Sequence, residues 1–200
     1  LVKNAVSEVE PSLFLSWITK GKENAARQKT YTIGESLLKQ VFSNILCNPQ
    51  MMDNFTNISP ETFKCFEKIF EIINEKEEYL DVTKNGGYRV HKFEQLIGVD
   101  ILWQMLMNCT DERVLKSLKH LMVALHLKIS GNNTDAKLNT WQTFVARCVE
   151  SLQIGTQKKN PLVTLNVITV LHSFIVNFEG KKFLQKDSPN TENISLTVVI

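Results

Sequence analysis

The chain has 200 residues, a formal net charge of +2, 43% hydrophobic residues and 22% charged residues. This length suits one large domain or two small ones, and it is enough to bury a core without disulfides or metals. The composition is that of a soluble globular protein, and the small net charge argues against a nucleic-acid surface. We therefore expect a folded domain without a nucleic-acid partner.

The N-terminus carries no recognisable targeting signal. The sequence begins at Leu1, and residues 1–5 lack the basic and apolar regions of a signal peptide. No apolar run approaches the roughly 20 residues that cross a bilayer. We expect an internal piece of a longer cytoplasmic protein that does not contact a membrane.

The cysteines are spaced like core residues. None forms a CxxC pair, and all lie in or beside apolar helical patterns, at Cys47, Cys65, Cys109 and Cys148. This favours reduced packing cysteines over a disulfide framework, which stays the alternative. Five Asn-x-Ser/Thr matches could carry glycans only in a secreted protein, at Asn54, Asn57, Asn108, Asn132 and Asn193.

The first part of the chain predicts helices. Apolar residues between Val2 and Thr19 suggest a helix that restarts near Pro11. Residues 33–47 carry an apolar stripe at helical spacing, and Asn48-Pro49 ends it. Ser59-Pro60-Glu61 is a typical helix start and opens a helix over residues 59–74.

Residues 74–92 interrupt this pattern. They are charged and then turn-forming at Asn85-Gly86-Gly87. We predict a solvated loop here and place the main internal boundary at 84/85.

The second part is denser in apolar helices. Residues 97–107 and 111–129 predict two helices, with Thr110 as the N-cap of the second. Residues 136–153 and 160–178 predict two more, of which the last is apolar nearly all round. Such a helix should be packed on several sides, by its neighbours or by a further helix.

The predicted fold class is all-α. Helices pair as 33–47 with 59–74, 97–107 with 111–129, and 136–153 with 160–178. Each pair takes about 40 residues, the length of armadillo and HEAT units. We predict N-terminal helical repeats over residues 1–84 and C-terminal helical repeats over 85–186. Residues 187–200 would then be a linker and the first β-strand of a following domain.

The candidate chemical groups are scattered along the chain. His91, His120, His126 and His172 form no HExxH motif, so solvent-facing or packed histidines are favoured over zinc ligands. Cys148 lies in a helical stripe, and Cys109 lies at a helix junction without a partnered histidine. We therefore predict no catalytic, metal-binding or cofactor-binding residues.

Other features have two interpretations each. The acidic residues Glu71, Glu75, Glu77 and Glu78 could bind a basic partner, but a solvated helix end is favoured. Gly86-Gly87 is interpreted as a turn rather than a phosphate loop, and Lys158-Lys159 and Lys181-Lys182 as helix ends rather than phosphate sites. Three tryptophans are assigned to the core rather than to an interface, namely Trp17, Trp103 and Trp141.

Several segments resemble the large ubiquitin-specific proteases of the fat-facets type. Residues 87–103 read GYRVHKFEQLIGVDILW and resemble a GY…LIGLDYLW segment in the armadillo-like region before that family's protease domain. Residues 144–152 (FVARCVESL) are similar to its F-I-x-x-C-x-x-x-L helix, and residues 167–175 to its next helix. Residues 194–198 (ISLTV) resemble the L-S-L-x-V strand that begins its ubiquitin-like domain.

The resemblance implies a scaffold rather than a protease. It runs in consistent order from Gly87 to Ile200, whereas before Lys84 only helical character agrees. The family's G-N-T-C-Y and G-H-Y boxes are absent from these 200 residues. We expect a non-catalytic, substrate-recruiting segment of a cytoplasmic thiol-dependent deubiquitinase. Its partners would be protein substrates, neighbouring domains and, through the parent protein, ubiquitin.

Two other functions stay open at this point. One is a stand-alone armadillo- or HEAT-type interaction module unrelated to ubiquitin, and the other is a small all-α enzyme. Continuation of the chain into a ubiquitin-like domain and a cysteine box would favour the deubiquitinase, and further helical repeats would favour the module. The enzyme would need a partnered acid–base set, which the sequence does not suggest.

Overall fold

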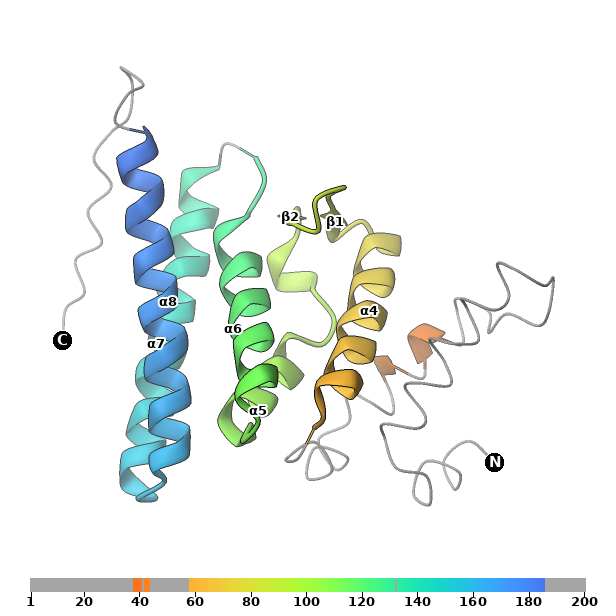
Figure 1. Ribbon diagram of the computed structural model, residues 1–200. Coiled ribbons are helices and arrows are strands. Elements are labelled where there is room, and N and C mark those ends of the chain that lie inside the picture. Colours follow the sequence, from red (N-terminus) through yellow and green to blue (C-terminus); the bar gives the residue numbers. More distant parts are fainter. Residues whose placement is uncertain (1–37, 41, 44–57, 132, 186–200) are drawn as a thin grey trace.

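The computed structural model describes residues 38–40, 42–43, 58–131 and 133–185, with side chains described as far as residue 178. Within these residues the chain is predominantly helical, as the sequence predicts. The elements are numbered as in Figure 1 and run from α4 to α8, with one small antiparallel sheet after α4. The predicted strand over 194–200, the helix near Pro11 and most of the helix over 33–47 lie outside the described residues.

Helix α4 spans Pro60–Lys76 and begins where the sequence predicts. The Ser59 hydroxyl accepts a hydrogen bond from the Thr62 backbone N–H at 3.2 Å, and Pro60 occupies the first helical position. Such a cap is worth about 1 kcal/mol. The predicted apolar stripe is buried, at Phe63, Phe66, Ile69, Phe70 and Ile73.

Residues 74–92 contain a β-hairpin rather than only a solvated loop. Strand β1 (Leu80–Val82) pairs antiparallel with β2 (Tyr88–Val90), and Val90 also bridges to Ile129. The residues of its inner face, Leu80, Tyr88 and Val90, are at most 6% exposed. The sequence prediction was wrong here because each strand is only three residues long, too short for alternation to stand out among charged neighbours. The 84/85 boundary falls in the turn of this hairpin and stays a prediction.

The next two helices begin after a glycine and after a capping aspartate, respectively. A short 3-10 helix (Phe93–Gln95) precedes α5 (Val99–Asn108), which starts after Gly98. Helix α6 (Glu112–Leu127) is capped by Asp111, whose Oδ1 accepts backbone hydrogen bonds from Arg113 and Val114 at 2.8 and 3.3 Å. The predicted cap Thr110 is therefore wrong by one residue, since the carboxylate of Asp111 reaches the free N–H groups of the first turn.

Helices α7 (Thr134–Gln157) and α8 (Pro161–Gln185) are longer than predicted. The side chains of Asn133 and Asn160 cap their first turns. Gly155 lies inside α7, and an added Cβ there would be 2.9 Å from the Thr164 hydroxyl oxygen. This glycine therefore allows the end of α7 to approach the beginning of α8.

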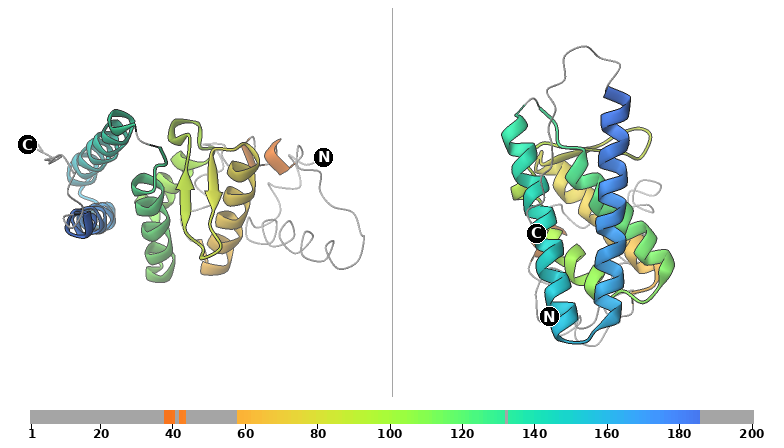
Figure 2. Two further views of the ribbon diagram at one scale, coloured as in Figure 1. Left: turned by 90° about the horizontal axis from the view of Figure 1, so that it is seen from above. Right: turned by 90° about the vertical axis from the view of Figure 1, so that its left-hand side faces the viewer.

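The helices pack as a layered stack (Figures 1 and 2). Successive helices α5 and α6 contact each other, as do α7 and α8, and α8 also packs against α5 and α6. The buried Asn166 of α8 donates hydrogen bonds to the carbonyl oxygens of Leu106 and Cys109, both at 2.9 Å. This side chain satisfies acceptors at the end of α5 and fixes how α8 sits on that helix.

Candidate functional site

The described histidine His126 lies in the core. His126 is 3% exposed, and its Nδ1–H donates to the Met122 carbonyl oxygen at 2.7 Å. The rings of Phe93 and Phe144 lie 4.5 and 4.4 Å from its imidazole, centroid to centroid. Burial lowers the His126 pKa to about 4, against a smaller raising effect of the Met122 hydrogen bond. The ring is therefore a neutral core group, which is the packed one of the two alternatives that the sequence left open.

The described cysteines also behave as packing residues. Cys148 is fully buried, and burial raises its thiol pKa to about 12. Cys109 is 2% exposed, its pKa is also raised by burial, and its thiol donates to the Asp111 carbonyl oxygen at 3.3 Å. A nucleophilic thiol needs the opposite shift, toward a lower pKa. Cys65 is half-buried, and Cys47 lies outside the described residues.

One constellation was not foreseen from the sequence. His91 Nδ1 lies 2.8 Å from the Ser130 hydroxyl, and His91 Nε2 lies 2.8 Å from the Asp81 carboxylate. In the sequence, Asp81 lies 10 positions before His91, and Ser130 lies 39 positions after it. No local motif could have grouped them, because the pairing of β1 with β2 and the bridge from Val90 to Ile129 bring them together.

The residue types of this constellation are those of a serine hydrolase, but its arrangement is not. In a hydrolytic triad the serine faces Nε2 and the carboxylate faces Nδ1, the reverse of what is found here. The Asp81 side chain is 57% exposed, so the group lacks the buried, oriented carboxylate that such a triad uses. The contacts instead fasten the hairpin to the segment that follows α6.

The predicted acidic run is mostly engaged inside the fold. Glu75 Oε1 accepts the Val82 backbone N–H at 2.9 Å, and Glu77 pairs with Lys39 at 2.6 Å. Glu78 has a φ of 57° in the turn after α4. The run is thus part of the turn between α4 and the hairpin rather than a purely solvated helix end, and a basic partner stays a prediction.

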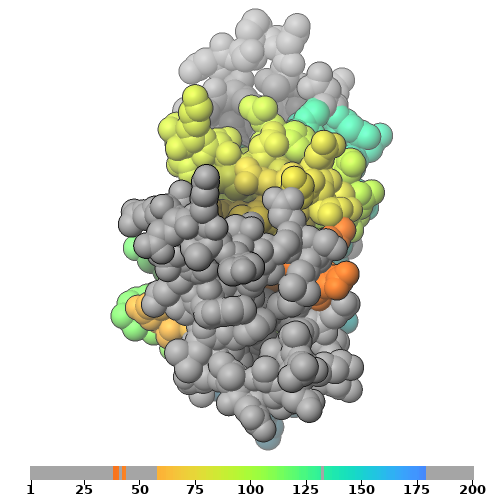
Figure 3. Space-filling model, turned by 90° about the vertical axis from the view of Figure 1, so that its right-hand side faces the viewer, coloured from red at the N-terminus to blue at the C-terminus, as the bar shows by residue number. Residues whose placement is uncertain are grey.

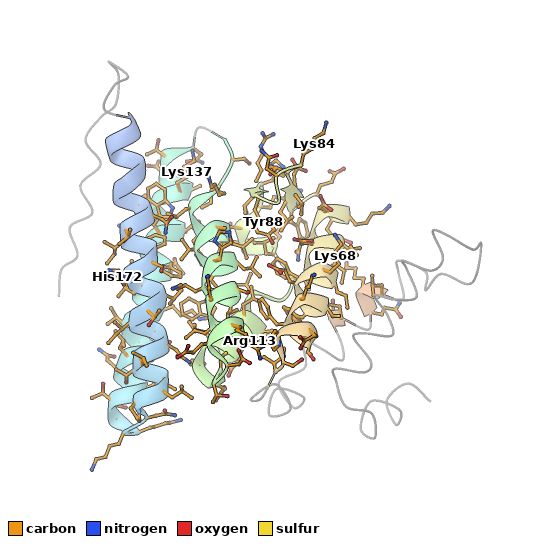
Figure 4. The ribbon with its side chains drawn as sticks, viewed as in Figure 1. Lys68, Lys84, Tyr88, Arg113, Lys137 and His172 are labelled. Atoms are coloured by element: carbon orange, nitrogen blue, oxygen red, sulfur yellow. The ribbon has the colours of Figure 1, made fainter. Side chains whose placement is uncertain are left out.

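A partly buried acid–phenol contact joins α4 to β2 at Tyr88, the residue labelled in Figure 4. The Tyr88 hydroxyl donates to Glu71 Oε1 at 2.9 Å and lies 3.4 Å from Glu67 Oε1. Burial raises the pKa of Glu67, and the neighbouring Glu71 raises it further. The pKa of Tyr88 is also raised, first by burial and then by these two carboxylates. The contact therefore holds a neutral phenol between α4 and β2.

The remaining predicted features are structural where they are described. Gly86 has a φ of 71° at the hairpin turn, and the Gly87 N–H donates to the Thr83 hydroxyl. Trp103 is 1% exposed, with the Arg147 guanidinium 4.9 Å from its ring centroid. The indole N–H of Trp141 donates to the His126 carbonyl oxygen, and the side chain of Asn108 donates to the Gln104 carbonyl oxygen. Lys159 lies in the turn between α7 and α8 and has a φ of 50°.

Several predicted residues lie outside the described part of the chain or its described side chains. They are Trp17, Asn54, Asn57, Asn132, Asn193, Lys181 and Lys182. Within the described residues no group of three or more His, Cys, Asp or Glu side chains is placed to hold a metal ion.

The described surface has two notable features. A hollow of about 640 Å³ lies beside the C-terminal half of α4, lined by Leu38, Lys39, Ile72, Ile73, Glu75, Lys76 and Glu77. Figure 3 views this side, with the hairpin region in yellow and residues near Leu38 in orange. The second feature is the outer side of α8, which carries four of the six large hydrophobic residues that are exposed in the described part of the chain, at Leu165, Ile168, Ile175 and Val176.

Residues Pro161–Phe178 of α8 are long and apolar enough to cross a bilayer, by length and composition alone. The sequence expectation that no stretch approaches this length was therefore wrong, because scattered Thr, Asn and Ser residues hide an 18-residue segment without charge. Core helices of soluble proteins pass the same test. Here the opposite side of α8 is buried against α5, α6 and α7.

Comparison with known proteins gives a limited similarity. No protein-family model matches the sequence. An alignment over 130 residues is 25% identical to human ubiquitin carboxyl-terminal hydrolase 9Y and covers 56% of this chain. The chain spans 5% of the length of that protein. The sequence therefore has a partial similarity to a ubiquitin carboxyl-terminal hydrolase.

Proposed function

We propose that the chain is a non-catalytic scaffold segment of a large cytoplasmic deubiquitinase of the fat-facets type, with an armadillo- or HEAT-like stack of helix pairs. The observation that carries the proposal is the similarity to a ubiquitin carboxyl-terminal hydrolase in a region that is 5% of that protein's length and helical here. The successive contacts of α5 with α6 and of α7 with α8 support the stack.

The chemistry of the described residues supports a non-catalytic role. The buried thiols of Cys109 and Cys148 have raised pKa values, and the His126 imidazole is held neutral in the core. The hydroxyl–imidazole–carboxylate contact at His91 has the reverse order of a hydrolytic triad. A scaffold of this kind would act by binding protein substrates and raising their local concentration near the protease domain of the same chain.

The cysteines fit a cytoplasmic setting. Cys109 and Cys148 are free thiols, which suits a reducing compartment.

The proposal is tested with ubiquitin substrates of two kinds. The purified chain should not release fluorophore from ubiquitin bearing a C-terminal fluorogenic amide, and turnover by the chain would refute the non-catalytic role. In the parent deubiquitinase, deleting this segment should lower kcat/KM for a ubiquitinated protein substrate but leave cleavage of the fluorogenic ubiquitin unchanged. An equal effect on both substrates would contradict recruitment.

A further inference from the structure

The turn of the β1–β2 hairpin contains the only Asn-Gly dipeptide of the sequence, Asn85-Gly86. Both residues are exposed, and a Cβ added to Gly86 would meet no atom within 4 Å. Figure 4 labels the preceding residue, Lys84, at the outer edge of the molecule. Among the hydrogen bonds of the described residues none involves the side-chain amide of Asn85. This amide is therefore open to water and to the backbone beside it.

An asparagine followed by glycine can react with its own backbone, because glycine has no Cβ to shield its amide nitrogen. The Gly86 nitrogen, once deprotonated, attacks the side-chain carbonyl carbon of Asn85. A C–N bond forms, the bond to the side-chain nitrogen breaks, and ammonia leaves after taking up a proton equivalent to the one that Gly86 lost. Water then opens the resulting five-membered imide at either carbonyl carbon, which leaves aspartate or isoaspartate at position 85.

We propose that Asn85 is a site of spontaneous deamidation and that the hairpin turn controls its rate. The Gly86 N–H donates to the Thr83 carbonyl oxygen at 2.9 Å, and the Thr83 N–H donates to the Gly87 carbonyl oxygen at 2.8 Å. With a φ of 71° at Gly86, this is a type I turn followed by a left-handed glycine, which gives Asn85 a ψ of about 0°. That ψ holds the Gly86 nitrogen beside the Asn85 nitrogen, whereas the imide ring needs it beside the Asn85 Cβ.

The turn must therefore open before Asn85 reacts. Opening breaks the hydrogen bond from the Gly86 N–H to the Thr83 carbonyl oxygen and the one from the Gly87 N–H to the Thr83 hydroxyl, which is 3.0 Å long. A single hydrogen bond of this kind changes an equilibrium about fivefold. The native chain should thus deamidate at Asn85 at least about tenfold more slowly than the unfolded chain, in which the turn is absent.

The isoaspartate product should loosen the hairpin. It routes the main chain through the former side chain of residue 85 and so adds a methylene carbon to the turn. Turn length fixes strand register, which here pairs Val82 with Tyr88. The Tyr88 hydroxyl in turn donates to Glu71 of α4, so a shifted register also weakens the contact between the hairpin and that helix. This inference does not depend on the deubiquitinase proposal, because it rests on the hairpin turn alone.

Incubation of the full chain at neutral pH, with and without denaturing urea, tests the site and its control. Peptide mapping by mass spectrometry should show deamidation of native Asn85 that is faster than at Asn133, whose side chain caps α7 and which precedes a threonine. Urea should raise the Asn85 rate at least about tenfold. Thr83→Val removes the hydroxyl that accepts the Gly87 N–H, so it should raise the native rate about fivefold and leave the rate in urea unchanged.

Matched variants separate the chemistry from the fold. Thr156→Val removes an exposed hydroxyl in α7 and should leave the Asn85 rate unchanged. Gly86→Ala should slow the reaction in urea, because its methyl group shields the nitrogen. Native Asn85 that deamidates no faster than Asn133 overturns the site, and equal rates with and without urea, or no acceleration by Thr83→Val, overturn control by the turn.

Hydrogen exchange tests the effect on the hairpin. The isoaspartate fraction of aged chain, recognised by isoaspartyl methyltransferase, should exchange the amides of β1 and β2 faster than the unaged chain does. Asn85→Asp is the matched control, because it adds the same charge without lengthening the backbone, and its hairpin should exchange like the wild type. Equal exchange in the isoaspartate fraction and in Asn85→Asp would overturn the loosening.

Discussion

Acid should destabilise this fold through a single buried histidine. His126 is 3% exposed between the rings of Phe93 and Phe144, and burial lowers its pKa from 6.5 to about 4. Between these pH values the unfolded chain binds a proton that the native chain does not. The free energy of unfolding must therefore fall as the pH drops through this window, and the fall levels off below about pH 4, where the native ring also becomes protonated.

The size of the stability loss follows from the shift of the His126 pKa. One pKa unit corresponds to about 1.4 kcal/mol, so the His126 contribution costs about 2 kcal/mol at pH 5 and about 3 kcal/mol at pH 4. Urea unfolding at pH 7.5 and pH 5 measures it. The variant His126→Leu, which does not titrate, should lose this part of the pH dependence whatever its stability at neutral pH. In this variant the Met122 carbonyl oxygen still accepts the backbone N–H of residue 126 within α6.

Other titrating groups set the range of the experiment. The pKa of Asp111 is lowered to about 2, chiefly by its hydrogen bond with Arg113, so its stabilisation is lost only between about pH 3.8 and 2. The raised pKa of Glu67 acts in the opposite direction to His126, since the native chain then holds the extra proton. Both groups remain in His126→Leu and cancel in the comparison. His120→Gln, on the exposed side of the same helix, is the matched control. The reasoning fails if His126→Leu and the wild type lose equal stability between pH 7.5 and 5.

Two further substitutions and one labelling experiment test the packing. Asn166→Leu should lower the free energy of unfolding by about 3 kcal/mol, because it leaves two buried carbonyl groups unpaired, as measured by urea denaturation. Gly98→Ala should cost more than about 2 kcal/mol, since φ is 99° and the new Cβ would be 2.9 Å from the Phe42 ring; the melting temperature reports this loss. Cys148 and Cys109 should resist a thiol-specific reagent until the chain unfolds, which mass spectrometry of labelled peptides can follow.

Matched variants make these predictions falsifiable. Asn177→Leu removes an exposed amide that bonds only to the Ser173 carbonyl, and it should cost less than about 0.5 kcal/mol. A similar loss in both asparagine variants would show that the Asn166 hydrogen bonds add nothing. Gly131→Ala has a φ of 86° but meets no atom within 4 Å, so it measures backbone strain alone, about 1 kcal/mol. Equal losses at Gly98 and Gly131 would remove the argument from Phe42. Rapid native labelling of Cys148 would contradict its burial.

Helix positions could be predicted because their signals are local. The Ser59-Pro60 start and the apolar stripe that follows act within one helix, and α4 begins where they predict. Helix α7 was predicted too short. Gly155 has a low helix propensity, which suggests a helix end, whereas in the structure it lies inside α7 where Thr164 leaves no room for a Cβ. That contact joins two helices, so no pattern within α7 could reveal it.

The contacts that define the surroundings of each candidate residue are long-range. His91, Asp81 and Ser130 meet only after β1 and β2 have paired, and the hairpin itself was missed. The burial of Cys148 was predicted correctly because an apolar stripe already implies burial, whereas the sequence left open whether His126 is packed or solvent-facing. The outer face of α8 was only half predicted, since helical spacing shows two apolar sides but not which of them the fold covers.

Two asparagines explain how apolar helices with little sequence distinction keep one register. Asn74 donates to the carbonyl oxygens of Phe70 and Ile97 and accepts the Ile97 N–H at 2.8 Å, while Asn166 donates to Leu106 and Cys109. An apolar stripe that slides by one helical turn can still bury its surface. A buried amide that slides loses its partners at a cost of about 1–3 kcal/mol. These hydrogen bonds therefore penalise the shifted packings that hydrophobic contact alone would tolerate.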